Sequence, residues 1–458
     1  MQENKTRREM KNMIELHMRN SSVGEEVIKT FTEDGKLKKE RKVKVIKGTI
    51  SATDSGVRKL SNTENVRTAN VYSKVAKDIH KTIVNRPSYM VLLNRGITAF
   101  IRGKHEYSAK NNVLRADEIY IIDGGTTKSI CDKVYEEGLL NPDCVLNLEI
   151  IVTEGLTPNE IAMISSSRNT NNPPADYTLA NAIGAFDNLQ KVLLPHYLRV
   201  IDFKQNSHLE KGLKEYLKCE ELVRYMMMLD ARNFYSVDRP YEKFPDAKSS
   251  EASKSIAALK AGAMSYDCMT EIINDVLTIR DYIAVDVTNR LMEWANSDSM
   301  EINYLVRFVL GTTGLKGFKK SEFMALCEMK SNSKQYKATI QKIKEKILKH
   351  PVKKSLFTQQ EYKFDIPKQC IYVFFSGFRA NTHLKTVTKT VDGYEVKEEK
   401  VVWTRNPDDI LSESLEYVWT SLIAQAKAMP GGGMDVICTP AVASQCYTNI
   451  LGLVLKKD

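Results

Sequence analysis

The sequence lacks the patterns that mark metal-binding, secreted and membrane-spanning proteins. Its eight cysteines include no CxxC pair, and its seven histidines are scattered with no HExxH motif. We therefore expect reduced thiols and no zinc site. No apolar run reaches about 18 residues, which excludes a transmembrane helix. The first 20 residues are charged throughout and contain no apolar signal core, so we expect a cytoplasmic protein with no membrane partner.

The composition is that of a globular protein with a basic balance. The chain has 458 residues, of which 42% are hydrophobic and 27% are charged, so two or three domains are expected. The net charge of +10 permits contact with nucleic acid or nucleotides but does not require it. Basic residues are concentrated at 36–47 and 330–354. Each of these segments is either a solvated face or a nucleic-acid contact.

The pattern along the chain predicts a mixed α/β protein in four parts. These are an N-terminal arm and strand at 1–60, an α/β domain at 61–208, a mainly helical domain at 209–350 and a smaller α/β domain at 351–458. Within them we expect a charged helix or arm over 1–30, a strand over 89–102 broken at 94–96, one helix from about 177 to 193, strands over 368–383 and a hairpin that turns at Asp392-Gly393.

Residues 119–138 read as a buried strand, a sharp turn and a helix. Ile119 to Ile122 form an apolar run rich in β-branched residues, which Asp123-Gly124-Gly125 then breaks. Thr126 or Thr127 is the expected N-cap of the following helix. Two glycines before a helix N-terminus can gather backbone N–H groups into a seat for a phosphate or carboxylate, and Lys128 adds a full charge. The alternative is a tight turn without a ligand.

Two further polar clusters lie at the ends of predicted elements in the same region. Asn94-Arg95-Gly96 interrupts an apolar strand, and an arginine there needs a partner. Residues 165–172 are all polar and are closed by two prolines, after a helix that the capping box Thr157–Glu160 starts at Pro158. We expect the three clusters to meet at one end of a βαβ-like unit, although capping and turn formation alone could explain them. The predicted ligand-binding residues are Asn94, Arg95, Gly124, Gly125, Thr126, Thr127, Lys128, Arg168, Asn169, Asn171 and Asn172.

The segment is not a P-loop, although it ends in Lys-Ser. Thr127 precedes Lys128 where that loop needs glycine, and Ile122 stands where its first glycine should be.

The three clusters, in this order, resemble the AIPR family, named for abortive phage infection proteins. The matching residues are Asn94-Arg95-Gly96-Ile97, then Ile122-Asp123-Gly124-Gly125-Thr126-Thr127, then 168–172, and finally Phe186-Asp187. The resemblance covers about residues 60–350. The family in turn is similar to the ParB/sulfiredoxin-like group and to DGQHR-motif proteins, which implies a ParB-like α/β domain that binds phosphates. Here Gly125-Thr126-Thr127 replaces Gln-His-Arg, and Lys128 would substitute for the missing arginine as a point charge.

The resemblance implies a phage-defence protein that binds nucleic acid or a nucleotide phosphate at the strand–turn–helix site. The expected partners are DNA or RNA and a partner protein of a defence operon, and self-association stays open. One alternative is a metal-dependent nuclease or nucleotide hydrolase with Asp123 as the catalytic acid, assisted by Asp176 and Asp187. Another is a scaffold that senses a phage component. The sequence does not identify a cofactor, and a nucleotide and a divalent metal are the two candidates.

Overall fold

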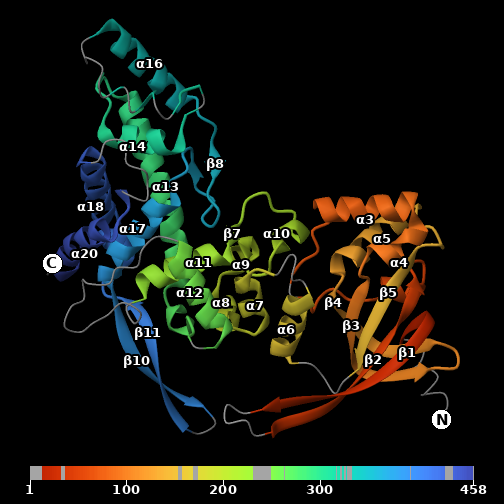
Figure 1. Ribbon diagram of the computed structural model, residues 1–458. Helices are drawn as coiled ribbons and strands as arrows, with labels where there is room; N and C mark the ends of the chain where they lie inside the picture. The colour runs from red at the N-terminus through yellow and green to blue at the C-terminus, as the bar shows by residue number, and fades with distance from the viewer. Residues whose placement is uncertain are drawn as a thin grey trace. The chain divides into compact units, whose positions relative to one another are not determined.

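The protein is described here by a computed structural model, and its described residues are mixed α/β, as the sequence predicts (Figure 1). The contacts divide the chain into two compact units. Unit 1 comprises Met1–Ile183 and Phe203–Leu213, and unit 2 comprises Gly184–Asp202 and Lys214–Asp458. The four-part division expected from the sequence stays a prediction. The structure describes residues 13–456 except for 32–36, 66, 153–156, 169–173, 231–248, 263, 316, 320–321, 324–325, 327–332, 392–393 and 429–436.

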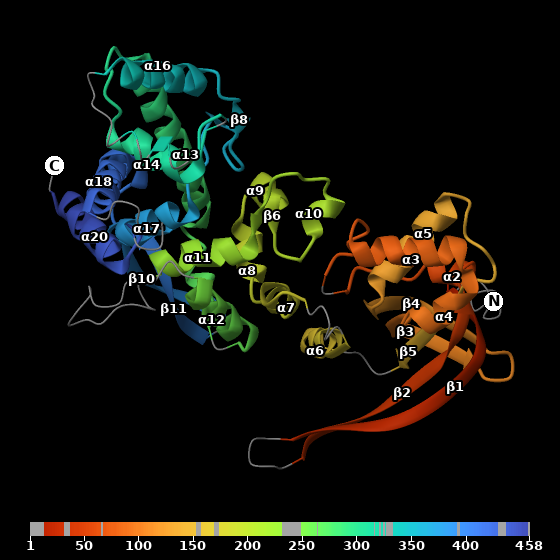
Figure 2. The same ribbon diagram turned by 45° about the horizontal axis from the view of Figure 1, so that its top comes forward.

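Unit 1 is built around a closed five-stranded barrel in the order β1-β2-β5-β3-β4. All neighbouring strands are antiparallel except β3 and β5, which are parallel. Beyond the barrel, β1 and β2 continue as a two-stranded ribbon (Figure 2), because β1 pairs with β4 only up to His17. The strands are β1 (Ile14–Phe31), β2 (Leu37–Ser51), β3 (Ile97–Ser108), β4 (Val113–Asp123) and β5 (Val145–Val152).

The side chains of the barrel strands alternate between two apolar clusters. Leu148 and Ile150 of β5 point into the barrel interior, whereas Ile151 packs outside it. The interior cluster continues into α3 (Lys74–Asn85) and α5 (Gly125–Glu136), which lie side by side over one end of the barrel (Figure 1). The outer cluster is covered by α6 (Pro158–Arg168) and α7 (Asp176–Ala182). Burial on both faces explains why these strands read as apolar runs.

The chain crosses between the units more than once. It leaves unit 1 after Ile183, returns for residues 203–213, which include α10 (Ser207–Glu210), and then re-enters unit 2. The returning segment bonds to the loop that precedes α3. The backbone N–H of Thr68 donates to the Gln205 carbonyl at 3.0 Å, and Nδ2 of Asn206 donates to the Thr68 carbonyl at 3.2 Å.

Unit 2 is mainly helical and carries one long hairpin. Its core includes Met226, Met227 and Met228, which are all buried, as expected for core filler. The remaining described elements of unit 1 are α2 (Ser55–Arg58), η1 (Pro87–Tyr89) and α4 (Met90–Leu93). The described elements of unit 2 are α8 (Asp187–Val192), α9 (Pro195–Val200), β6 (Ile201–Asp202), β7 (Leu217–Lys218), α11 (Cys219–Leu229), α12 (Ser249–Lys260), η3 (Asp267–Met269), α13 (Ile273–Asn296), α14 (Tyr304–Thr313), α16 (Lys334–Leu348), β8 (Lys353–Lys354), β9 (Glu361–Tyr362), α17 (Lys368–Phe378), η4 (Arg379–Asn381), β10 (Thr382–Val391), β11 (Tyr394–Trp403), α18 (Pro407–Ala428) and α20 (Pro440–Leu455).

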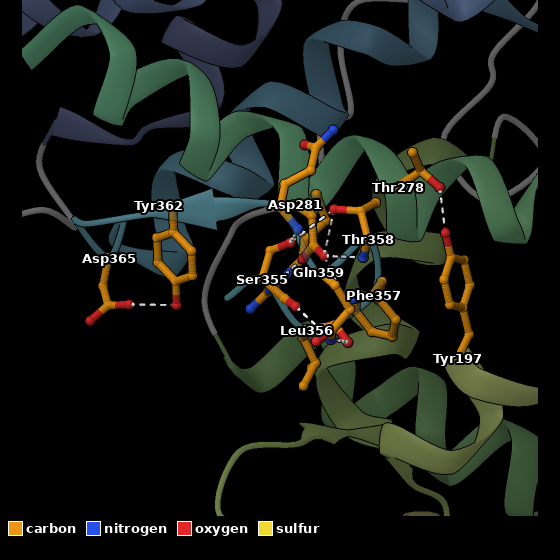
Figure 3. A network of polar contacts seen from close by, with 12 residues as sticks. Tyr197, Thr278, Asp281, Ser355, Leu356, Phe357, Thr358, Gln359, Tyr362 and Asp365 are labelled. Carbon is orange, nitrogen blue, oxygen red and sulfur yellow. Dashed lines mark hydrogen bonds and ion pairs between the residues drawn. The ribbon is translucent and has the colours of Figure 1, made fainter. Parts of the chain in front are cut away.

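A buried carboxylate fixes the β8–β9 hairpin of unit 2 to α13. Asp281 is fully buried, and its Oδ2 accepts hydrogen bonds from the backbone N–H groups of Phe357 (2.6 Å) and Thr358 (2.8 Å). Its Oδ1 accepts from Nη1 of Arg280 at 2.8 Å. Figure 3 shows this carboxylate at the centre of a network that includes the Tyr197–Thr278 and Tyr362–Asp365 hydrogen bonds. The loop amides are thus satisfied by an anion that the protein itself supplies.

Four local expectations were wrong. Of the charged helix or arm expected over residues 1–30, the helix is wrong for residues 14–31, which form β1 because Ile14, Leu16 and Met18 alternate inward between polar residues. The first part of the expected strand at 89–102 is η1 and α4, because Pro87 opens a helical turn there. The expected helix at 177–193 ends at Ala182 and resumes at Asp187, with Gly184 between them at a φ of +84°.

The fourth error concerns residues 368–378, which form α17 rather than a strand. From Cys370 on, its residues are buried, and a run that is apolar on every face does not distinguish a helix from a strand. The hairpin β10–β11 is confirmed, with Val391 paired to Tyr394, although the expected turn residues Asp392 and Gly393 lie outside the described residues. Among the described helices, none is both long enough and apolar enough to span a bilayer.

Candidate functional site

The glycine turn before α5 exists because two backbones approach closely there. Strand β3 begins where its antiparallel neighbour β4 ends, so Thr98 pairs with Asp123 and Gly96 faces Gly124. Gly124 has a φ of +86°, and a Cβ on it would lie 2.3 Å from the Gly96 carbonyl oxygen. A Cβ on Gly96, at a φ of +87°, would lie 2.0 Å from the Asn147 carbonyl oxygen. Both positions therefore require glycine, whatever else the turn does.

The side chain of Asn94 locks the same turn. Its Oδ1 accepts from the Gly96 N–H at 2.8 Å and from Oγ1 of Thr127 at 3.2 Å. Nδ2 of Asn147 donates to the carbonyls of Val91 (2.8 Å) and Asn94 (3.2 Å). The predicted motif Asn94-Arg95-Gly96 is thus a turn, and a hydrogen bond from Thr127 to Asn94 connects it to the first turn of α5.

Helix α5 begins without a side-chain cap, contrary to the expectation that Thr126 or Thr127 caps it. Its N-cap is Gly124, and Oγ1 of Thr127 is engaged by Asn94. Within the part of the chain that the structure describes, no group accepts a hydrogen bond from the backbone N–H of Gly125, Thr126 or Thr127. A helix start in this condition carries partial positive charge and suits an anion.

A pocket of about 310 Å³ lies at this helix start. It brings together residues from all three predicted clusters, because β3 and β4 are antiparallel and α6 ends beside them. The pocket also includes residues that the sequence analysis missed, Asn62, Asn65 and Arg67. Its lining contains, from the predicted set, Asn94, Arg95, Gly124, Gly125, Thr126, Thr127, Arg168 and the proposed catalytic acid Asp123.

Two arginines of the predicted set reach the pocket from different elements. Nη1 of Arg168, in the last turn of α6, donates to Oγ1 of Thr98 at 3.0 Å, and its Nη2 pairs with Oε1 of Glu149 on β5. Nη1 of Arg95 donates to the Arg168 carbonyl at 3.2 Å. Arg95 is exposed, whereas the Arg168 guanidinium is tied to the barrel by Thr98 and Glu149. Arg168 therefore has a structural task in addition to any binding role.

Lys128 does not line the pocket. Its Nζ lies 2.5 Å from Oδ2 of Asp132, one turn further along α5, and only 12% of its side chain is exposed. The structure therefore does not place Lys128 in the pocket, and the expected role of Lys128 at the turn stays a prediction. The positions Asn169, Asn171 and Asn172 lie outside the described residues.

Arg67, rather than Lys128, is the further cationic side chain that lines the pocket. It lines the pocket from the loop before α3, and burial lowers its pKa, with partial compensation from the Asp123 carboxylate. The loop reaches the site because Ser61 pairs with the edge of β4, its carbonyl accepting from the Ile121 N–H at 2.8 Å. Nothing in the polar stretch 51–74 signals this pairing.

Asp123 lines the pocket without the carboxylate of Asp176, which was expected to assist it. Oδ1 of Asp123 accepts from the Gly124 N–H at 2.8 Å. Asp176 is not among the residues that line the pocket, and Asp187 belongs to unit 2. Across the described ranges, no three His, Cys, Asp or Glu side chains group as candidate metal ligands.

The chain matches the family model described as AIPR protein over residues 63–355, which is more than half of its length. It therefore belongs to the AIPR family, as the ordered motifs predicted. The family name refers to abortive phage infection, and membership suggests a role in phage defence. No curated protein and no solved structure matches the chain. The relationship to ParB-like proteins stays a prediction.

Proposed function

We propose that this AIPR-family protein binds a phosphate group of a nucleotide or nucleic acid in the pocket at the start of α5, as part of phage defence. The observation that carries the proposal is that Arg67, Arg95 and Arg168 line one pocket at the start of α5, where no described residue accepts from the first three backbone N–H groups of the helix. Backbone amides and guanidinium groups are the two donors that phosphates most often find in proteins.

The electrostatics of the pocket support an anionic ligand. The helix start contributes roughly half a positive charge. The lowered pKa of Arg67 indicates that burial disfavours its charged form, and a bound anion would relieve that cost. Arg95 is exposed at the pocket and able to move onto a ligand.

A binding titration tests the proposal. Arg95→Ala removes an exposed pocket arginine, and Arg86→Ala removes an exposed arginine of the same unit that does not line the pocket. We expect Arg95→Ala to weaken binding of nucleotides or short oligonucleotides about tenfold, which corresponds to about 1.4 kcal/mol, while Arg86→Ala leaves it unchanged. Equal affinities for the two variants would reject the site. Binding should also weaken as salt is raised from about 50 to 200 mM.

A second candidate function is phosphate-ester hydrolysis, because the Asp123 carboxylate lines the same pocket as the proposed phosphate seat. A nuclease or nucleotide hydrolase of this kind would need a divalent metal held partly by Asp123. Assays with DNA, RNA and nucleoside triphosphates across several divalent metals separate the two functions. Asp123→Asn should abolish cleavage if the site is catalytic. If no metal supports cleavage, binding alone remains.

A further inference from the structure

The lining of the pocket at the start of α5 includes exposed apolar residues as well as charged ones. Val75 and Leu93 line it, and they are among the most exposed large apolar residues of unit 1, at 63% and 66%. Ile79 and Ala69 line it as well. Exposed apolar side chains beside a cationic seat suit a ligand that joins an anion to a ring or sugar, rather than inorganic phosphate.

One carboxamide oxygen at the pocket has no hydrogen-bond donor among the described residues, which is an observation independent of the helix start. Asn65 is only 8% exposed, and its Oδ1 accepts from the Arg67 N–H at 3.2 Å. Nδ2 of Asn62 donates to Oγ of Ser129 at 3.3 Å, and its buried Oδ1 has no donor among the described residues. Buried amides are normally hydrogen-bonded. The unsatisfied acceptor at Asn62 points to a ligand that presents a hydrogen-bond donor.

The charge around the pocket matches one phosphate rather than three. Arg67, Arg95 and Arg168 face one carboxylate, Asp123, and Arg168 is already paired with Glu149. This leaves about one net positive charge, to which the helix start adds roughly half a charge. A phosphate monoester carries about −1.5 to −2 charges at pH 7. A triphosphate adds about two more negative charges, which nothing described at the pocket would neutralise.

We infer that the ligand is a nucleoside carrying a single terminal phosphate, either a free nucleoside monophosphate or the phosphorylated end of a nucleic-acid strand. This inference rests on the proposed function. The phosphate binds the α5 N–H groups beside Arg95, the sugar or base lies along Val75 and Leu93, and Asn62 accepts from a donor of the ligand. The volume of about 310 Å³ is at the small end for a ligand pocket, which favours a short ligand over a long one.

Calorimetric titration of the full chain tests the inference. AMP, GMP, CMP and UMP are each compared with their triphosphates and with inorganic phosphate. We expect at least one monophosphate to bind at least tenfold tighter than its triphosphate and tenfold tighter than inorganic phosphate. A single-stranded oligonucleotide with a 5′-phosphate, compared with the same strand ending in a 5′-hydroxyl, then distinguishes a strand end from a free nucleotide as the source.

A matched pair of variants tests the apolar wall. Leu93→Ser polarises the wall, and Leu139→Ser changes a leucine that is 51% exposed in the same unit and does not line the pocket. We expect Leu93→Ser to lower monophosphate affinity about fivefold or more without changing the affinity for inorganic phosphate, and Leu139→Ser to change neither.

Three outcomes would overturn the inference. They are triphosphates binding as tightly as monophosphates, inorganic phosphate binding as tightly as monophosphates, and Leu93→Ser behaving like Leu139→Ser. Each of these leaves the proposed function standing as long as Arg95→Ala still weakens binding. The proposed function itself fails if Arg95→Ala and Arg86→Ala bind alike.

Discussion

Two groups of backbone amides in this protein differ in what accepts their hydrogen bonds. In unit 2, the amides of Phe357 and Thr358 bond to the carboxylate of Asp281, which is buried beside Arg280. In unit 1, no carboxylate of the described residues accepts from the first amides of α5, and three arginines line the same pocket. In unit 2 the protein supplies the acceptor for its amides. In unit 1 the amides are the donors of the phosphate site that we propose.

The largest expected effect comes from removing the internal anion. Asp281→Ala leaves two loop amides and the Arg280 guanidinium without their acceptor, so we expect the free energy of unfolding to fall by about 3–5 kcal/mol. Thermal unfolding should shift down by on the order of 10 °C. The control is Asp365→Ala, a carboxylate of the same network with a 62% exposed side chain, which should cost less than about 1 kcal/mol. Equal shifts would mean that the Asp281 staple does not stabilise unit 2.

The second-largest expected effect is the stabilisation of the folded protein by an added anionic ligand. A ligand present at about 100 times its dissociation constant stabilises the folded state by about 2.7 kcal/mol. AMP should therefore raise the unfolding temperature of the wild-type chain, and it should do so less for Arg95→Ala. The Asp281→Ala variant should keep its response to AMP, because the two groups of amides belong to different units. Loss of that response would show that the comparison between two independent sites is wrong.

A smaller effect is expected from the glycine that shapes the site. Gly124→Ala introduces a Cβ at a positive φ, 2.3 Å from the Gly96 carbonyl oxygen, whereas Gly138→Ala, at a φ of +71°, meets nothing within 4 Å. The left-handed conformation alone costs about 1 kcal/mol. We expect Gly124→Ala to destabilise the protein by clearly more than Gly138→Ala in urea unfolding. Similar losses would mean that the backbone approach at Gly96 is easily relieved.

The smallest effect is expected at Lys128. Its ammonium pairs with Asp132 within α5 and lies outside the pocket lining, so Lys128→Ala should cost about 0.3–0.5 kcal/mol and leave nucleotide affinity unchanged. A tenfold loss of nucleotide affinity in titrations of this variant would show that Lys128 takes part in binding.

Local sequence signals predicted the elements around the site well. The capping box at Thr157 is formed as expected, with its N–H donating to Oε2 of Glu160 at 2.8 Å. Burial alone would raise the pKa of Glu160, but hydrogen bonds from Thr157 and Arg41 lower it. The strand, glycine turn and helix predicted over 119–138 are also present, as the end of β4 and as α5, because β-branched runs and glycine pairs act over a few residues.

The rest of the site depended on long-range pairing that short motifs do not encode. Arg67 reaches the pocket only because Ser61 pairs with the edge of β4, about 60 residues away. Lys128 looked like the obvious cation from its place in the sequence, yet a partner one helical turn away directs it elsewhere. Spacing along a chain predicts which residues share a turn, but not which charge a neighbour has already engaged.

The crossing of the chain between units has a consequence for biosynthesis. The loop that carries Arg67 is bonded at Thr68 to Gln205 and Asn206, which follow the first excursion into unit 2. During translation, the loop that carries Arg67 therefore lacks these bonds when Ile183 has left the ribosome, and about twenty further residues must emerge before Gln205 and Asn206 can form them. A nascent chain stalled in that interval would carry the full barrel sequence and still lack the contacts that hold this loop.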